Sequence, residues 1–164
     1  SFLYKKDNVG FTLQFDDAPS EPIEIANAVS VPSSFANINV SEPNISNLYK
    51  GVQLIEVSLE EIAWGRSGDK GNKANIGIIA RHPNLLPYIW DTFSEEKIVE
   101  IFSHFLENDK IDRHYLPGIS GVNYVLHDVL GGGGTTSLRN DPQGKGYAQI
   151  LLSCKISVPK NLLV

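Results

Sequence analysis

The sequence contains no methionine and a single cysteine, Cys154, among its 164 residues. One cysteine cannot form an internal disulfide, and no Cys/His spacing resembles a zinc site, so we predict neither a metal nor a cofactor. No apolar run approaches the roughly 20 residues that cross a bilayer, and no signal peptide is visible. These absences predict a cytoplasmic protein with no membrane partner. Because the chain lacks methionine and begins at Ser1, we also expect a piece of a longer protein.

Basic residues are fewer than acidic ones. The chain has 14 Lys and Arg and 19 Asp and Glu, which gives a net charge of −5. Nucleic-acid-binding proteins usually carry a basic surplus or a basic stripe, and the sequence has neither. We therefore predict no nucleic-acid partner, while a local basic pocket for one small anion stays open. Hydrophobic residues make up 41% of the chain, which is enough for the core of one domain.

The first 50 residues carry little that predicts chemistry. Residues 9–15 and 23–31 alternate apolar and polar side chains, which indicates two strands, and residues 32–46 are rich in Ser, Asn and Pro. We interpret residues 1–50 as an extension or the tail of a preceding domain, and residues 51–164 as the main domain.

The main domain shows alternating helix and strand patterns. Strands are expected at residues 52–57, 62–66, 74–80 and 111–116, with the second and third joined as a hairpin. Helices are expected at 84–93, from the N-cap Ser94 to about Asn108, and after Ser120 on the stripe Val122, Val125, Leu126, Val129 and Leu130. A final strand is expected at 148–158. The pattern predicts an α+β fold, a two-layer α/β sandwich of ferredoxin-like topology with two main helices and a mainly antiparallel or mixed sheet.

Residues 67–72 form the most distinctive stretch, because Gly68 and Gly71 bracket an acid and a base, Asp69 and Lys70. Glycine supplies positive φ angles without steric cost, so the stretch predicts a tight turn. Asp69 and Lys70 could bind an anion or take part in acid–base chemistry there. The alternative is a solvated turn that only connects two strands.

Polar residues later in the chain offer further candidates. Asn123 and His127 lie four residues apart on the expected helix, so His127 is either a general base or a histidine that caps carbonyls. Four glycines at 131–134 can let the backbone approach a ligand closely, although the phosphate-loop pattern is absent. Arg139 could clamp a carboxylate or phosphate, or it could pair with Asp141 at the surface.

Taken in order, these motifs resemble the C-terminal domain of the acyclic terpene utilisation protein AtuA family. The stretches that carry the resemblance are residues 63–72, 74–77, 123–127, 130–134 and 137–139, with Asp141, Gly144 and Lys145. The match extends from about Val57 to Val158 and leaves out residues 1–50. The resemblance implies a ferredoxin-like fold, a larger N-terminal domain before this one, and a place in citronellol and geraniol breakdown through acyl-CoA intermediates. It assigns no reaction, so whether the domain is an enzyme stays open.

We hypothesise that the loops at 67–72 and 131–145 meet and bind an anionic acyl-CoA or a carboxylated terpenoid. The expected substrate-binding residues are Ser67, Lys70, Asn72, Asn75, Asn123, Gly132, Gly133, Arg139 and Lys145, and the expected acid–base residues are Asp69 and His127. Lys70 and Arg139 would hold the anion together. The alternative is an interaction module that docks the N-terminal domain or forms a homo-oligomer. Its first contacts would be Trp64, Trp90 and Leu151, the last on the polar face of the final strand.

Overall fold

The computed structural model describes residues 9–23 and 40–163. The chain separates into two compact units, residues 1–38 and 39–164. In the first unit, β1 (Thr12–Leu13) pairs antiparallel with β2 (Glu21–Pro22). The strand expected at 9–15 is therefore only two residues long, and most of the strand expected at 23–31 lies outside the described residues.

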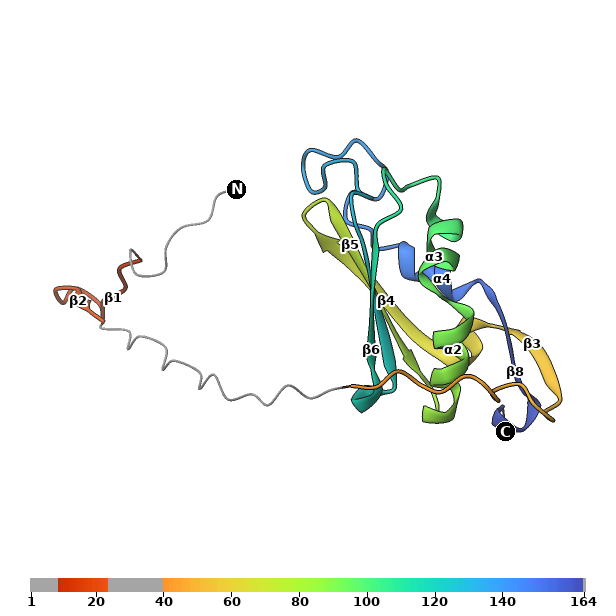
Figure 1. The fold of residues 1–164 in the computed structure, drawn as a ribbon. Coiled ribbons are helices and arrows are strands. Elements are labelled where there is room, and N and C mark those ends of the chain that lie inside the picture. Colours follow the sequence, from red (N-terminus) through yellow and green to blue (C-terminus); the bar gives the residue numbers. More distant parts are fainter. Residues whose placement is uncertain (1–8, 24–39, 164) are drawn as a thin grey trace. The chain divides into compact units, whose positions relative to one another are not determined.

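A four-stranded antiparallel sheet forms the centre of the second unit (Figure 1). Its strands, in spatial order, are β4 (Ala63–Lys70), β5 (Lys73–Ala80), β7 (Gly121–Leu126) and β6 (Ile111–Leu116). A separate antiparallel pair joins β3 (Leu54–Ser58) to β8 (Lys155–Pro159). The single-turn helix α1 (Leu59–Ile62), which starts with a capping box formed by Ser58 and Glu61, connects β3 to β4.

Three longer helices, α2 (Leu86–Thr92), α3 (Glu95–Phe102) and α4 (Tyr147–Leu152), lie on one side of the four-stranded sheet (Figure 1). Short 3₁₀ turns are η2 (Pro83–Leu85), η3 (Pro117–Ile119) and η4 (Lys160–Leu162). The core between helices and sheet includes the fully buried side chains of Ile76, Ile78, Ile98, Phe102 and Tyr124. The predicted α+β, two-layer, ferredoxin-like fold with an antiparallel sheet is confirmed. No described helix is long and apolar enough to cross a membrane.

Side chains on the other side of this sheet face away from the helices, and we call that side the open face. Alternation along the strands assigns to it the residues Trp64, Arg66, Gly68, Lys70, Lys73, Asn75, Gly77, Ile79, Asp112, His114, Leu116, Asn123, Val125 and His127. Their strand neighbours Ala74, Ile76 and Ile78 are buried against the helices. The open face is therefore the side of the sheet that α2, α3 and α4 leave uncovered (Figure 1).

Several expected elements are confirmed, including the hairpin of β4 and β5, strand β6, and α3 with Ser94 as its N-cap. The Ser94 hydroxyl accepts a hydrogen bond from the amide of Lys97 at 3.3 Å. Helix α3 ends at Phe102 instead of near Asn108. In the hairpin, β4 continues to Lys70, so the expected six-residue turn contains only two loop residues, Gly71 and Asn72.

The prediction of a helix after Ser120 is wrong, because residues 121–126 form strand β7. Val122, Tyr124 and Leu126 are buried while Asn123 and Val125 between them are half-buried, which is a period of two. Valines at 122, 125 and 129 also fit helical spacing, and this coincidence misled the prediction. The β-branched content of the stretch favours a strand, which is the outcome.

The single strand expected at 148–158 is also wrong, because helix α4 occupies residues 147–152 and only β8 after it is extended. The buried side chains of α4 are Tyr147, Ala148 and Leu151, at helical spacing. Leu151 is therefore in the core and not on an exposed strand face. Ala, Gln and Leu favour helix, whereas the apolar run alone fitted both structures.

Candidate functional site

The hairpin tip between β4 and β5 is tied to the glycine-rich loop at 131–134. Gly71 has a φ of +70°, as the first residue of a two-residue hairpin loop commonly does. The Asn72 side chain accepts a hydrogen bond from the amide of Gly132 at 2.7 Å and donates one to Oδ1 of Asp128 at 3.1 Å. Its backbone carbonyl accepts from the amide of Val129 at 3.0 Å. Asn72 thus holds two loops together.

Gly133 shows how closely these loops approach. Its φ is +72°, and a Cβ built on it would collide with the carbonyl oxygen of Gly71. The predicted meeting of the two loops is therefore real, and glycine is required at this position by backbone contact. The neighbouring Gly134 also has a positive φ, of +52°, but a Cβ there would meet nothing within 4 Å.

Ser67 lies on the helix side of β4, with a side chain only 5% exposed. Its hydroxyl donates to the carbonyl of Lys145 at 3.0 Å and accepts from the amide of Ala148 at 2.9 Å. The second bond satisfies an amide in the first turn of α4, which lacks a side-chain cap of its own. Ser67 therefore anchors the start of α4 to the sheet.

The polar residues of the open face form a chain across three side chains. Lys70 donates from Nζ to Oδ1 of Asn75 at 3.4 Å and to the carbonyl of Asp69 at 2.9 Å. Asn75 in turn donates from Nδ2 to Oδ1 of Asn123 at 3.3 Å. Three predicted substrate-binding residues are thus brought together, because Asn75 pairs with Val125 of β7, two residues from Asn123.

Lys145 reaches the open face from the loop before α4. A Cβ built on Gly68 would lie 3.1 Å from Nζ of Lys145, so the absence of a side chain at Gly68 leaves room for the ammonium group. Lys70 follows Gly68 by two residues on the same face. The structure thereby brings Lys145 near Lys70, and Gly68 is a contributor that the sequence did not reveal.

His127 follows β7 on the open face and is 6% exposed. Its Nε2 lies 2.7 Å from Oδ2 of Asp112 on the neighbouring β6. This hydrogen bond is the main reason why the pKa of Asp112 is lower than usual, and burial opposes it. Asp112 was missed by the sequence analysis, although its polar position between Ile111 and Arg113 in an expected strand was a usable signal.

A family model for the AtuA ferredoxin-like domain matches residues 57–157. The chain belongs to this family. No curated protein and no solved structure gives a significant match. The matched segment runs from the last two residues of β3 into β8, and so contains every residue of the site described above.

Besides Ser67, the predicted residues Arg139 and Asp69 of the AtuA-like domain also lie apart from the open face. Arg139 donates from Nη1 to the carbonyl of Phe105 at 3.0 Å, beyond the end of α3 on the helix side of the sheet. Alternation in β4 also directs the half-buried Asp69 toward the helix side, because it pairs with the buried Ala74. The expectation that Lys70 and Arg139 hold one anion together is therefore wrong, since their side chains lie on opposite sides of the sheet.

The AtuA-like domain has two hollows near these residues. A groove of about 350 Å³ on the open face is lined mainly by apolar side chains, among them Trp64, Ile79, Leu116 and Ile119. A pocket of about 660 Å³ on the helix side is lined by Phe105, Arg139 and Tyr147, among others. Among the described residues, no cluster of His, Cys, Asp and Glu could hold a metal ion.

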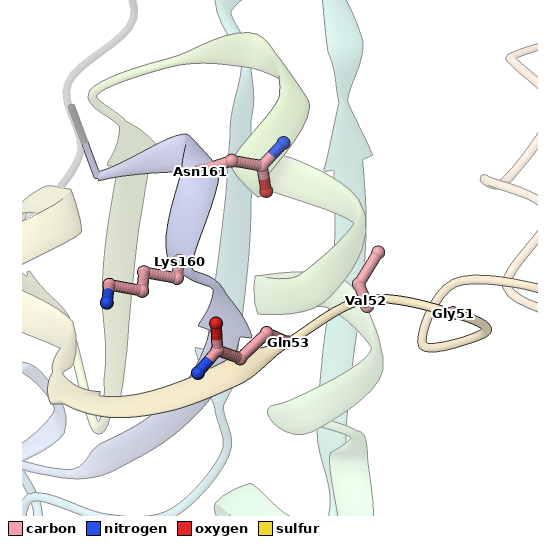
Figure 2. A pocket seen from close by; sticks show the side chains of 5 residues that line it. All are labelled: Gly51, Val52, Gln53, Lys160 and Asn161. Carbon is pink, nitrogen blue, oxygen red and sulfur yellow. The ribbon is translucent and has the colours of Figure 1, made fainter.

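A third hollow, of about 450 Å³, is lined by none of the predicted site residues (Figure 2). Figure 2 shows its side chains on the segment leading into β3 and on η4, namely Gly51, Val52, Gln53, Lys160 and Asn161. It offers one cation and two amides, and no group suited to acid–base chemistry. We therefore place the candidate site at the open face.

Proposed function

We propose that this AtuA-like domain binds, across its open face, a ligand with an anionic end and an apolar body. An acyl-CoA or a carboxylated terpenoid has this character. The observation that carries the proposal is the division of the open face into a basic half, around Lys70 and Lys145, and an apolar half, around Trp64 and Ile119.

The basic half gathers positive charge in a protein whose net charge is −5. Lys70 and Lys73 pair at the end of the hairpin, and the backbone of Lys110 bonds to His127 beside them. Within the described residues, no carboxylate lies within ion-pairing distance of Lys70, Lys73, Lys110 or Lys145. Neighbouring ammonium groups repel one another, and an anion bound between them would relieve that repulsion.

The apolar half lies at the other end of the same strands. Trp64 is 55% exposed and Ile119 is 58% exposed, and both line the 350 Å³ groove. Contiguous exposed apolar side chains of this kind mark binding sites more often than scattered ones do. A ligand with its charged groups near Lys70 would extend its apolar body over Gly77, which has no side chain of its own and lines this groove.

The glycine-rich loop has a supporting role in this proposal. The side-chain groups of Asn72 and Ser67 are already hydrogen-bonded inside the protein, so they shape the site instead of contacting the ligand. His127, held by Asp112 next to the basic half, is the group best placed for acid–base chemistry on a bound ligand.

Calorimetric titration of the full chain with geranyl-CoA, free CoA and citronellic acid tests the proposal. We expect Lys70→Gln with Lys145→Gln to weaken CoA binding at least about tenfold and to reduce its salt dependence. Trp64→Ala should weaken the binding of geranyl-CoA but leave the affinity for free CoA unchanged. Lys160→Gln, a lysine at the distant hollow of Figure 2, is the matched control. The proposal would be contradicted if a folded protein bound none of the three ligands, or if Lys160→Gln weakened CoA binding as much as the double variant did.

A second candidate function is docking of another protein surface or a second copy. The exposed Trp64, Ile79, Leu116 and Ile119 favour it, whereas Trp90 and Leu151 are buried and contribute nothing. Light scattering over a concentration series separates the two functions. A dimer that Ile119→Ser dissociates, with no ligand binding, would support docking.

A further inference from the structure

Arg139 is held in a fixed position at the helix-side pocket. Its Nη1 donates to the carbonyl of Phe105, and its guanidinium carbon lies 5.9 Å from the centre of the Phe105 ring. Its backbone amide donates to the Ser137 hydroxyl at 3.2 Å. A Cβ built on Gly131 would lie only 3.0 Å from Nε, so glycine there makes room for the guanidinium group. Such a cation needs little reorganisation before it binds an anion.

The charge of Arg139 has no acidic partner among residues 9–23 and 40–163. Within the described part of the chain, no carboxylate lies at ion-pairing distance from its guanidinium group. Asp141 lines the same pocket, but its two oxygens accept hydrogen bonds from the amides of Lys145 at 2.9 Å and Gly146 at 2.7 Å. Guanidinium groups bind carboxylates well, and the negative charge of Asp141 would disfavour a dianion more than a monoanion.

Beside these charged groups, much of the pocket wall is apolar. The ring of Phe105 stacks on Tyr147 with centroids 5.0 Å apart, and Ile150 lies beside them in the lining. Leu138, at the same pocket, is fully exposed to solvent. The volume of about 660 Å³ falls within the usual range of small-molecule sites. A ligand with an apolar body would cover Leu138 and remove its surface from water.

We infer that this pocket is a second ligand site, which takes a monocarboxylate with an apolar body and pairs its carboxylate with Arg139. The site is separate from the open face, because the sheet lies between Arg139 and Lys70. It does not depend on the function proposed above.

Amide-resolved NMR titration of the full chain with sodium octanoate tests the inference. We expect octanoate to shift the amides of Phe105, Leu138 and Gly146, with octyl phosphate weaker and octanol without effect. Arg139→Gln should weaken octanoate binding at least about tenfold, because a charge-assisted pair is lost. Leu138→Ser should weaken it about threefold or more without touching the core, since Leu138 is exposed.

Lys160→Gln, at the hollow of Figure 2, is the matched control and should leave octanoate binding unchanged. Octanoate shifts at Asn75 and Asn123 with none at Phe105, Leu138 or Gly146 would overturn the inference and place the carboxylate on the open face alone. Unchanged affinity in Leu138→Ser would also overturn it, even if Arg139→Gln failed to fold. Loss of CoA binding in the Lys70 and Lys145 variant with octanoate binding intact would show that the two sites are independent.

Discussion

Asn72 and Asn75 are three residues apart, yet they belong to regions with opposite character. At the hairpin tip, Asn72 makes both of its side-chain hydrogen bonds to the loop that carries Asp128 and Gly132. On the open face, Asn75 bonds only to Lys70 and Asn123, which are themselves exposed or half-buried. Both asparagines are half-buried, so the difference lies in their partners. Asn72 ties one loop to another, whereas Asn75 bonds to side chains of the open face, which can exchange partners for a ligand.

Two glycines differ in the same way, one being needed for the packing of the loops and the other lying on the open face. Gly133 is required because another backbone lies against it, whereas Gly68 leaves space that the ammonium group of Lys145 occupies. The first glycine belongs to the packing of the loops. The second belongs to the open face, and a substitution there would displace a flexible side chain and not a peptide group.

The largest effect is expected from Gly133→Ala. The new Cβ would collide with the carbonyl of Gly71, and the φ of +72° would be strained as well, so we expect a loss of about 3 kcal/mol or more of folding free energy. Urea denaturation measures it. Gly134→Ala is the matched control, because its Cβ meets nothing, and should cost about 1 kcal/mol through φ strain alone. Equal losses in both variants would mean that the loops are not in contact.

A smaller effect should separate the two asparagines directly. Asn72→Ala leaves the Gly132 amide and the Asp128 carboxylate without their partner, so we expect a loss of about 1–2 kcal/mol. Asn75→Ala removes one exposed and one half-buried hydrogen bond but separates no loops, so we expect a smaller loss, below about 1 kcal/mol. For CoA binding measured by calorimetry we expect the opposite ranking, with Asn75→Ala weakening the affinity more than Asn72→Ala. A large stability loss in Asn75→Ala would place Asn75 among the structural residues.

The sequence predicted the fold class and the meeting of the two loops, because turn glycines and apolar spacing are local signals. It exchanged helix and strand in two places. At residues 121–126, valines fit both periods, and tertiary pairing with β5 and β6 selected the strand. At residues 147–152, contact with β4 through Ser67 selected the helix, and nothing local to the apolar run reveals that contact.

The basic half of the open face could not be found by scanning for a basic run. Lys70 and Lys73 belong to one hairpin, but Lys110 and Lys145 come from two other segments, and sheet pairing brings Lys110 to the same end of the face. The separation of Arg139 from Lys70 was equally hidden. Side-chain alternation continues along β4 as far as Lys70 and directs Lys70 to the open face, whereas the sequence had predicted a turn at residues 67–72.

The smallest predicted effect concerns the Asp112–His127 pair. The hydrogen bond from His127 lowers the pKa of Asp112 below its ordinary value near 4. Because the folded-state pKa is the lower one, this pair contributes its full stabilisation above pH 4 and loses it as the pH falls through the folded-state pKa. Asp112→Asn should therefore be less stable than the natural chain at pH 6, and the difference should shrink between pH 4 and pH 3. Urea denaturation across this range measures it, with Asp109→Asn as the control that lacks the contact. A difference that stays constant down to pH 3 would show that Asp112 acts by shape and not by its charge.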